Sequence, residues 1–409
     1  MFIFRYRYGV THLCGKRSLS LLLQIQIQIQ TVRSVYITRV SKFLPNEPIG
    51  NDEMEGVLGM VGDKPSKARA IVLRNNGIKR RFYALKNGKR THSNAELASI
   101  AIKQLFDEKL PISKLQVLTA GTTSPEQILP SHAAAIHGQL GINQRLELIS
   151  ASGACCSSMQ GLKYAFMAIR SGEADVAVSV GSERFSSWLT ADRFQPEVEN
   201  LMQLEANPYI AFEKDFLRWM LSDGAGAALL QPTPNEEGIS LKLEWIETTS
   251  FANELETCMY AGSVKNEDGS ITGWNDMDVP EWTKNSVFAL KQDTRLLGEN
   301  IVPKGGVYLA ELMEKHGLTV DMVDYYLPHM SSEFFKKQIF EHHERIGMNI
   351  PYEKWFYNLP QVGNVGSASP FLMLEELFHS GRLKKGDRLL VMAPESARFS
   401  YAYLYLTVV

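Results

Sequence analysis

The sequence predicts an α/β fold in which helices cover both faces of a largely buried sheet. Short, nearly all-apolar runs such as "ADVAVSVGSE" (174–183) alternate along the chain with helical patterns. Strands of this kind are typical of sheets that are hidden on both faces. The helical pattern before this run has one apolar face, made by Met159, Leu162, Phe166 and Ile169. Covered helix faces and hidden strands together indicate a layered α/β architecture.

The first half of the chain alternates strands and helices. The predicted strands are 34–45, 114–124, 146–154 and 174–183, and the predicted helices are 91–110, 130–141 and 158–172. Asn94 is the expected N-cap of the helix in 91–110, since asparagine side chains accept hydrogen bonds from free N–H groups at helix starts.

The second half repeats this order of strand, small-residue loop, helix and strand. Its predicted strands are 222–231, 238–249, 323–330, 388–395 and 401–409, and its predicted helices are 331–347 and 371–383. We therefore expect two similar halves, 35–210 and 211–409. The segments 186–220 and 252–300 fit neither series, and we interpret them as insertions that cap a pocket.

The first 34 residues differ from the rest of the chain. They contain five basic residues and no acidic one, and the first acidic residue is Glu47. This composition resembles an organellar transit peptide. The strict Gln/Ile alternation has the period of a strand, however, which favours an upstream extension outside the fold. Under either interpretation, the segment contains no apolar run of the roughly 20 residues that are needed to span a bilayer.

Composition narrows the class of protein. The chain has 409 residues, 44% hydrophobic and 22% charged, with a net charge of −2, which is typical of a soluble globular protein and gives no reason to expect nucleic-acid or membrane binding. Four scattered cysteines form neither a disulfide framework nor a CxxC zinc motif. We expect a reducing, cytoplasmic compartment.

The stretch "ASGACCSSMQG" (151–161) places Cys155 and Cys156 between a predicted strand and a predicted helix. A buried cysteine is usually a small hydrophobic residue. Free N–H groups and the positive dipole end at a helix start stabilise a thiolate, however, and predict a lowered thiol pKa. Small residues before the pair leave room for a substrate, so the setting suits a covalent nucleophile.

Two further residues occupy the same architectural position in the second half. His329 ends the strand in "YYLPHMSS", and Asn364 lies in "QVGNVGSAS". Taken alone, His329 is most simply a structural hydrogen-bonding residue and Asn364 a turn former. The loops that follow strands are where α/β folds place active sites, and a cysteine with distant histidine and asparagine residues is a known nucleophilic arrangement.

From about Val35 to the C-terminus, the chain resembles the thiolase-fold condensing enzymes, most closely β-ketoacyl-acyl-carrier-protein synthase III. The motifs that carry the resemblance are, in order, "YITRVSKFLPNEPIGNDEM", "NNGIKRRFYA", "TAGTTSPEQILPSHAAAIHGQLG", "ASGACCSSMQGLKYAFMAIRSGEADVAVSVGSE", "SDGAGAALL", "YYLPHMSSEF" and "VGNVGSAS". The resemblance implies a thiolase-like five-layer αβαβα fold built from two similar halves, a homodimer, and a Cys-His-Asn triad.

The resemblance also selects the nucleophile. In this family it typically lies 17 positions before the glycine of the "SG" that ends the helix, and the residue 17 positions before Gly172 is Cys155. Cys156 is then a packing residue, and His329 and Asn364 complete the triad. The implied reaction is a decarboxylative Claisen condensation of an acyl-CoA or acyl-carrier-protein thioester with malonyl-acyl carrier protein. No metal or cofactor is expected.

Several residues depart from the family pattern. The C-terminal loop, glycine-rich in the family, reads "APESARFSYA", so Glu395, Ser396 and Arg398 bring bulk and charge toward the acyl-cysteine. We therefore expect Ser396 and Arg398 to bind substrate. Leu129 stands where the family sends a residue into the partner subunit's pocket. Basic side chains form a solvated face or meet an acidic carrier protein; they are Lys79, Arg80, Arg81, Lys86, Lys89 and Arg90, and separately Lys336 and Lys337.

Three alternatives remain distinct from this interpretation. A degradative thiolase needs a second cysteine near the C-terminus, and none follows Cys258. A non-decarboxylating condensing enzyme would be of the hydroxymethylglutaryl type, with a base such as Glu126, or of the head-to-head type. A non-catalytic dimer partner would usually have lost the cysteine.

Overall fold

The computed structural model describes residues 32–61, 65–66, 69–194 and 217–409. Most of the predicted extension 1–34 lies outside these residues, as does 195–216 of the first predicted insertion. Arg33–Val409 groups as one compact unit, so both predicted halves belong to a single body.

Nine strands of the described residues form one mixed sheet. Along the chain they are β1 (Tyr36–Phe43), β6 (Val117–Thr122), β7 (Glu147–Ser152), β8 (Ala177–Glu183), β9 (Gly224–Gln231), β10 (Leu241–Ser250), β15 (Tyr325–Pro328), β16 (Arg388–Glu395) and β17 (Ser400–Val408). Their order in the sheet is β15-β16-β17-β10-β1-β9-β8-β6-β7.

The strand directions repeat from one half of the sheet to the other. β6 and β8 are parallel, as are β15 and β16. β8 and β9 are antiparallel, as are β16 and β17. β1 pairs antiparallel with β9, and β10 pairs antiparallel with β17. The two series meet where β1 pairs antiparallel with β10 at Tyr36–Lys242 and Ile37–Leu241.

The predicted boundary between the two halves stays a prediction. The sequence places residues 211–409 in the second half, but β9 lies between β1 and β8 in the sheet of the first half. An apolar run shows that a strand exists and does not show its partners, which long-range pairing decides.

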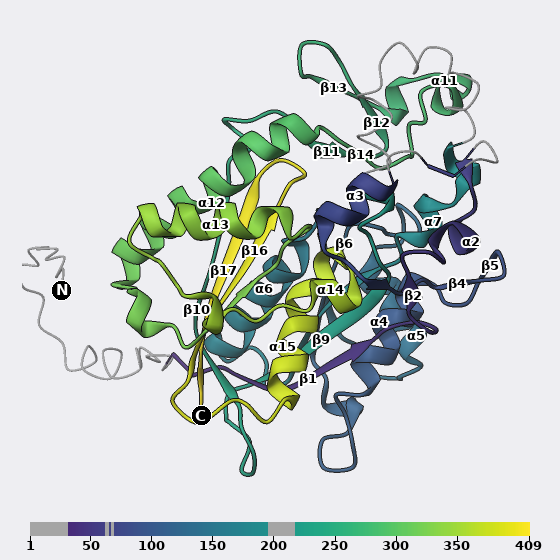
Figure 1. Ribbon diagram of the computed structural model, residues 1–409. Coiled ribbons are helices and arrows are strands. Elements are labelled where there is room, and N and C mark those ends of the chain that lie inside the picture. The colour runs from purple at the N-terminus through teal and green to yellow at the C-terminus, as the bar shows by residue number, and fades with distance from the viewer. Residues whose placement is uncertain (1–31, 62–64, 67–68, 195–216) are drawn as a thin grey trace, which may run out of the picture. The chain divides into compact units, whose positions relative to one another are not determined.

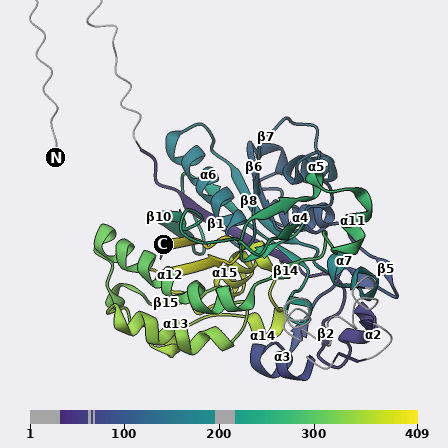
Figure 2. The same ribbon diagram turned by 90° about the horizontal axis from the view of Figure 1, so that it is seen from above.

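The principal helices lie in three layers, and the two strand series of the sheet lie between them. α4 (Asn94–Lys103) and α5 (His132–Leu140) pack on the strands of the first series, and α12 (Thr294–His316) and α13 (Phe334–Arg345) lie beside those of the second. α6 (Ser157–Ser171) and α15 (Ser369–His379) each contact strands of both series. Figure 1 shows the layers in succession from α12 and α13 to α4 and α5, and Figure 2 shows them from above. The predicted five-layer αβαβα architecture is confirmed.

Alternation along the strands produces the layers, because successive strand side chains point to opposite faces. In β17, Tyr401, Tyr403 and Tyr405 belong to the core shared with α12 and α13. Their neighbours Ala402, Leu404 and Leu406 belong to the core around α6 and α15.

Short elements surround this body. The strands pair as β2 (Ile49–Gly50) with β3 (Arg80–Arg81), β4 (Leu85–Lys86) with β5 (Lys89–Arg90), β11 (Met259–Tyr260) with β14 (Lys291–Gln292), and β12 (Ser263–Lys265) with β13 (Ile271–Gly273). The helices are α2 (Met54–Leu58), α3 (Arg69–Asn76), α7 (Ser186–Leu189), α11 (Val279–Lys284) and α14 (Leu359–Val362).

Two local features differ from the sequence prediction. The N-cap of α4 is Ser93, whose side chain accepts from the Glu96 N–H in a capping box, whereas Asn94 donates to Thr122 Oγ1. The 23-residue helix α12 was not predicted, because Pro303 lies inside it and a glycine pair, 305–306, follows. The pair serves close packing: a Cβ at Gly306 would lie 1.9 Å from the His342 ring.

We expect glycine at 121 to be essential for the position of α6. A Cβ at Gly121 would lie 2.2 Å from the backbone nitrogen of Ser158, so G121A should lower the free energy of unfolding by about 1–3 kcal/mol through overpacking. Gly138, in α5, has no atom within 4 Å of the equivalent position. As the matched control, G138A should raise that free energy by about 0.5–1 kcal/mol. Denaturant unfolding measures both, and equal stability of the two variants would contradict the packing argument.

Candidate active site

The cysteine pair is divided between two environments. Cys156 is the N-cap residue of α6, only 1% exposed, and its sulfur donates to the Ala393 carbonyl at 2.9 Å. Cys155, one residue earlier, is half-buried and lines a cavity. The structure therefore leaves Cys155 as the member of the pair that a substrate can reach.

His329 follows directly after β15. Its backbone N–H donates to the Met392 carbonyl at 2.8 Å, which continues the parallel pairing with β16. The side chain is 3% exposed, and burial lowers its pKa to about 4. The imidazole is therefore neutral at neutral pH and carries one ring N–H.

Asn364 is fixed on both sides by backbone hydrogen bonds. Its N–H donates to the Met220 carbonyl, and its carbonyl accepts from Ser222 N. Its side-chain oxygen accepts from the Gly366 N–H at 2.9 Å. Since Oδ1 is engaged in this way, Nδ2 is the side-chain atom left to donate to a substrate.

Cys155, His329 and Asn364 line one cavity. It encloses about 510 Å³ including its open mouth. Apolar side chains form much of its wall, namely Phe185, Leu217, Leu221, Met259, Leu290, Leu297 and Ile301. The structure therefore brings together three residues that are far apart in the sequence, beside a surface suited to an acyl chain.

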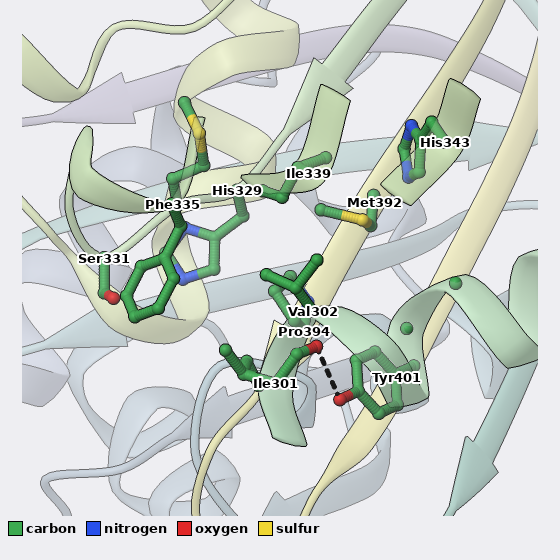
Figure 3. Close-up of a pocket in the computed structure, with 13 residues that line it drawn as sticks. Ile301, Val302, His329, Ser331, Phe335, Ile339, His343, Met392, Pro394 and Tyr401 are labelled. Atoms are coloured by element: carbon green, nitrogen blue, oxygen red, sulfur yellow. Dashed lines mark hydrogen bonds between the residues drawn. The ribbon is translucent and has the colours of Figure 1, made fainter. Parts of the chain in front are cut away.

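His329 also lines a second cavity of about 410 Å³. It shares Ile301, His329, Ser331 and Pro394 with the first cavity. Figure 3 shows Phe335, Ile339, Val302 and Met392 around it, with Tyr401 donating to the Ile301 carbonyl. This second space is predominantly apolar.

Hydrogen bonds tie the two central helices together beside the first cavity. Ser158, in α6, donates to the Ser367 carbonyl at 2.5 Å. The Ser367 hydroxyl in turn donates to the Gly121 carbonyl in β6 at 3.1 Å. The buried Glu183 carboxylate accepts from the backbone N–H groups of Thr123, Ser124 and Ser367, which joins β8 to both loops.

The thiol pKa departs from the sequence prediction. Burial raises the pKa of Cys155, and the carboxylates of Glu395 and then Glu183 raise it further. The predicted lowering by the helix start is therefore wrong for this resting arrangement. Glu395 lies close because its Oε2 accepts from the N–H groups of Ala154 at 2.9 Å and Cys156 at 3.1 Å.

The remaining predicted site residues are scattered. Ser396 lines the cavity. Arg398 is exposed and donates to the Leu255 carbonyl, and it is not among the lining residues. Leu129 is 82% exposed and also lies outside the lining. Glu126 forms an ion pair with Arg184 at 3.5 Å.

Within the described residues, no group of three or more His, Cys, Asp or Glu side chains is arranged to hold a metal ion. No helix in that same part of the chain is long and apolar enough to cross a bilayer.

Comparison with known proteins agrees with this geometry. Residues 313–402 match the 3-oxoacyl-[acyl-carrier-protein] synthase III C-terminal family, and residues 77–207 match the thiolase N-terminal domain family. The β-ketoacyl-[acyl-carrier-protein] synthase III of Neisseria gonorrhoeae is 23% identical over 355 residues, covering 87% of this chain and 93% of that protein.

The chain is a ketoacyl synthase III-like condensing enzyme of the thiolase fold.

Solved structures agree on the fold of this ketoacyl synthase III-like enzyme. The 3-oxoacyl-[acyl-carrier-protein] synthase III of Aquifex aeolicus has a TM-score of 0.65 and 21% identity, covering 91% of this chain and 99% of that chain. OleA of Xanthomonas campestris has a TM-score of 0.67 and 19% identity, covering 92% of this chain and 99% of that chain.

The sequence prediction missed the direct contact of Glu395 with the loop that carries Cys155, although it noted the charge in "APESARF".

Iodoacetamide should modify Cys155 before Cys156 and Cys258. The latter two are 1% and 0% exposed, and their sulfurs donate to the Ala393 and Asp293 carbonyls. Because the thiol pKa of Cys155 is raised, its labelling rate should rise with pH from 7 to 9. Peptide mass mapping over time measures the order. Faster labelling of Cys156, or unchanged labelling in C155S, would refute the assignment.

Proposed function

We propose that this enzyme joins two acyl thioesters by decarboxylative Claisen condensation through an acyl-Cys155 intermediate. The observation that carries the proposal is the convergence of Cys155, His329 and Asn364 on one cavity with apolar walls. A covalent intermediate divides a difficult carbon–carbon bond formation into two easier steps. Because this chemistry needs a free thiol, the enzyme would work in a reducing compartment such as the cytoplasm.

In the loading step, the Cys155 sulfur attacks the carbonyl carbon of the primer thioester. The bond from this carbon to the donor's sulfur breaks, and the donor thiol leaves with the proton that Cys155 gives up. The primer is an acyl group on coenzyme A or on acyl carrier protein, and the apolar wall of the cavity receives its chain.

In the condensing step, malonyl-acyl carrier protein loses carbon dioxide and forms an enolate, whose α-carbon attacks the acyl-Cys155 carbonyl. Asn364 Nδ2 and the neutral His329 ring are donors that stabilise the enolate oxygen without protonating the carbanion. Donors of this kind contribute about 3–4 kcal/mol each in oxyanion sites. The Cys155 thiolate then leaves and is reprotonated.

Carrier-protein docking would use only part of the predicted basic cluster. Arg81 is buried and donates to the Trp219 carbonyl, so it is unavailable to a partner. Lys336 donates to Tyr357 and Lys337 pairs with Glu341. The exposed residues of the first cluster are Lys79, Arg80, Lys86, Lys89 and Arg90, of which Arg90 also pairs with Glu126.

The second cavity favours a second candidate function. A head-to-head condensation has a long chain on both reaction partners, and the space beside His329 offers the nucleophilic partner a separate apolar site. OleA of Xanthomonas campestris, a structural neighbour, is known with bound lauric acid and lauroyl-CoA. A panel of acyl donors, with and without malonyl-acyl carrier protein, distinguishes the two functions by product mass.

H329A and N364A should each lower the condensation rate by about 10²- to 10³-fold, because each removes one enolate donor. Acylation of Cys155 should stay measurable in both variants, as an added acyl mass on the intact protein. Loss of acylation in both would overturn this division of roles. Failure of the wild type to gain acyl mass from any donor would favour the non-catalytic dimer partner.

We also propose a homodimer in which Leu129 enters the partner subunit's pocket. Leu129 and Ile128 are 82% and 70% exposed, an unusual exposure for neighbouring large apolar side chains. L129E should therefore weaken the dimer and lower the rate of loading with long acyl donors. Sedimentation velocity measures the first effect. A monomeric wild type, or a variant with unchanged assembly and loading, would contradict the proposal.

A further inference from the structure

A carboxylate lies against the loop that carries the nucleophile. Glu395 is the last residue of β16 and is 6% exposed. Its Oε2 accepts from the N–H groups on both sides of Cys155, those of Ala154 and Cys156. A Cβ at Gly153 would lie 3.4 Å from this same oxygen. The small residues of the loop therefore let the carboxylate approach the backbone around Cys155.

The two oxygens of Glu395 are used differently. Oε2 holds the loop, whereas Oε1 has no hydrogen-bond partner within the part of the chain that the structure describes, and Glu395 forms no ion pair there. Glu183 differs, because donors from Thr123, Ser124 and Ser367 fill both of its oxygens. Glu395 thus keeps one carboxylate oxygen without a hydrogen bond while its other oxygen holds the loop on both sides of Cys155.

Loading requires a group that takes the proton of Cys155. Asn364 has no basic atom, and the His329 ring is a poor base because burial lowers its pKa to about 4. Burial raises the pKa of Glu395, so that its carboxylate holds a proton more strongly than an ordinary one. The raised pKa values of Cys155 and Glu395 thus favour the protonated form of each group, and the two groups interact electrostatically.

We propose that Glu395 is the general base of acyl loading, a role that rests on the proposed function. The S–H bond of Cys155 breaks as its electron pair forms the bond to the primer's carbonyl carbon, and the proton moves to Glu395. When the donor's sulfur leaves, Glu395 returns this proton to it. The carboxylate is regenerated, and no net charge enters or leaves the site.

The test measures single-turnover acylation of Cys155 by an acyl-CoA in E395Q. A glutamine oxygen can still accept from Ala154 and Cys156, so the loop keeps its hydrogen bonds while the base is lost. At pH 7 the loading rate should fall about 10²-fold, the scale of general-base catalysis. Condensation of E395Q that has been loaded to completion should proceed at the wild-type rate.

The pH profile separates this role from a structural one. The titratable groups around the pair are Cys156, Glu183, His329 and Tyr401. In the wild type, loading should fall as pH drops through the raised pKa of Glu395 and level off above it. In E395Q the levelling-off at the pKa of Glu395 should be absent, and the rate should climb about tenfold per pH unit until the thiol itself ionises.

E55Q is the matched control. Glu55 has the same 6% exposure but pairs with Arg69 and accepts from Ser66 rather than from the loop around Cys155, so the loading rate and pH profile of E55Q should match the wild type. Loading by E395Q as fast as or faster than the wild type at pH 7 would overturn the proposal. Slow loading by E395Q with the same pH profile as the wild type would indicate a structural role and would also overturn the proposal. A wild type that no acyl thioester loads would instead refute the proposed function.

Discussion

The geometry of the active site depends on the tie between the N-terminal ends of the two central helices. Ser158 of α6 donates to the carbonyl of Ser367, just before α15, and Ser367 donates back to Gly121 in β6. A Cβ at Gly181 would lie 2.3 Å from that same Ser367 carbonyl oxygen. The loop with Asn364 and the loop with Cys155 are therefore held at one place by close backbone packing.

This packing determines the electrostatics of the site. Glu183 accepts from Ser367 in this tie, and Glu395 at the end of β16 accepts from Ala154 beside Cys155. No cation pairs with either carboxylate among the described residues. Burial without a counter-charge penalises each added negative charge. The favourable helix start at α6 is thus outweighed, and the pKa of the Cys155 thiol is raised so that its protonated form is favoured.

Much of the fold could be predicted because its signals are local. The apolar runs located the strands of the sheet, and the sequence motifs located the three residues of the cavity. What the local signals do not show depends on distant contacts or on exceptions to pattern. β9 joined the first series because its pairing partners are β1 and β8. α12 was missed because Pro303 and the glycine pair 305–306 interrupt its pattern. The position of Glu395 depends on how β16 lies against the loop before α6. Its partner in this loop, Cys156, is 239 residues away in the sequence.

The buried carboxyl group of Glu395 bears on which substrate Cys155 would accept under the proposed function. A malonyl group carries its own carboxylate, and bringing it to Cys155 as an acyl donor would set two like charges close together at low dielectric. A monocarboxylic acyl chain meets no such repulsion and gains from the apolar wall. Under the proposed function, malonyl would therefore be disfavoured as the first acyl donor, and Glu395 would help to set the order in which the two thioesters react.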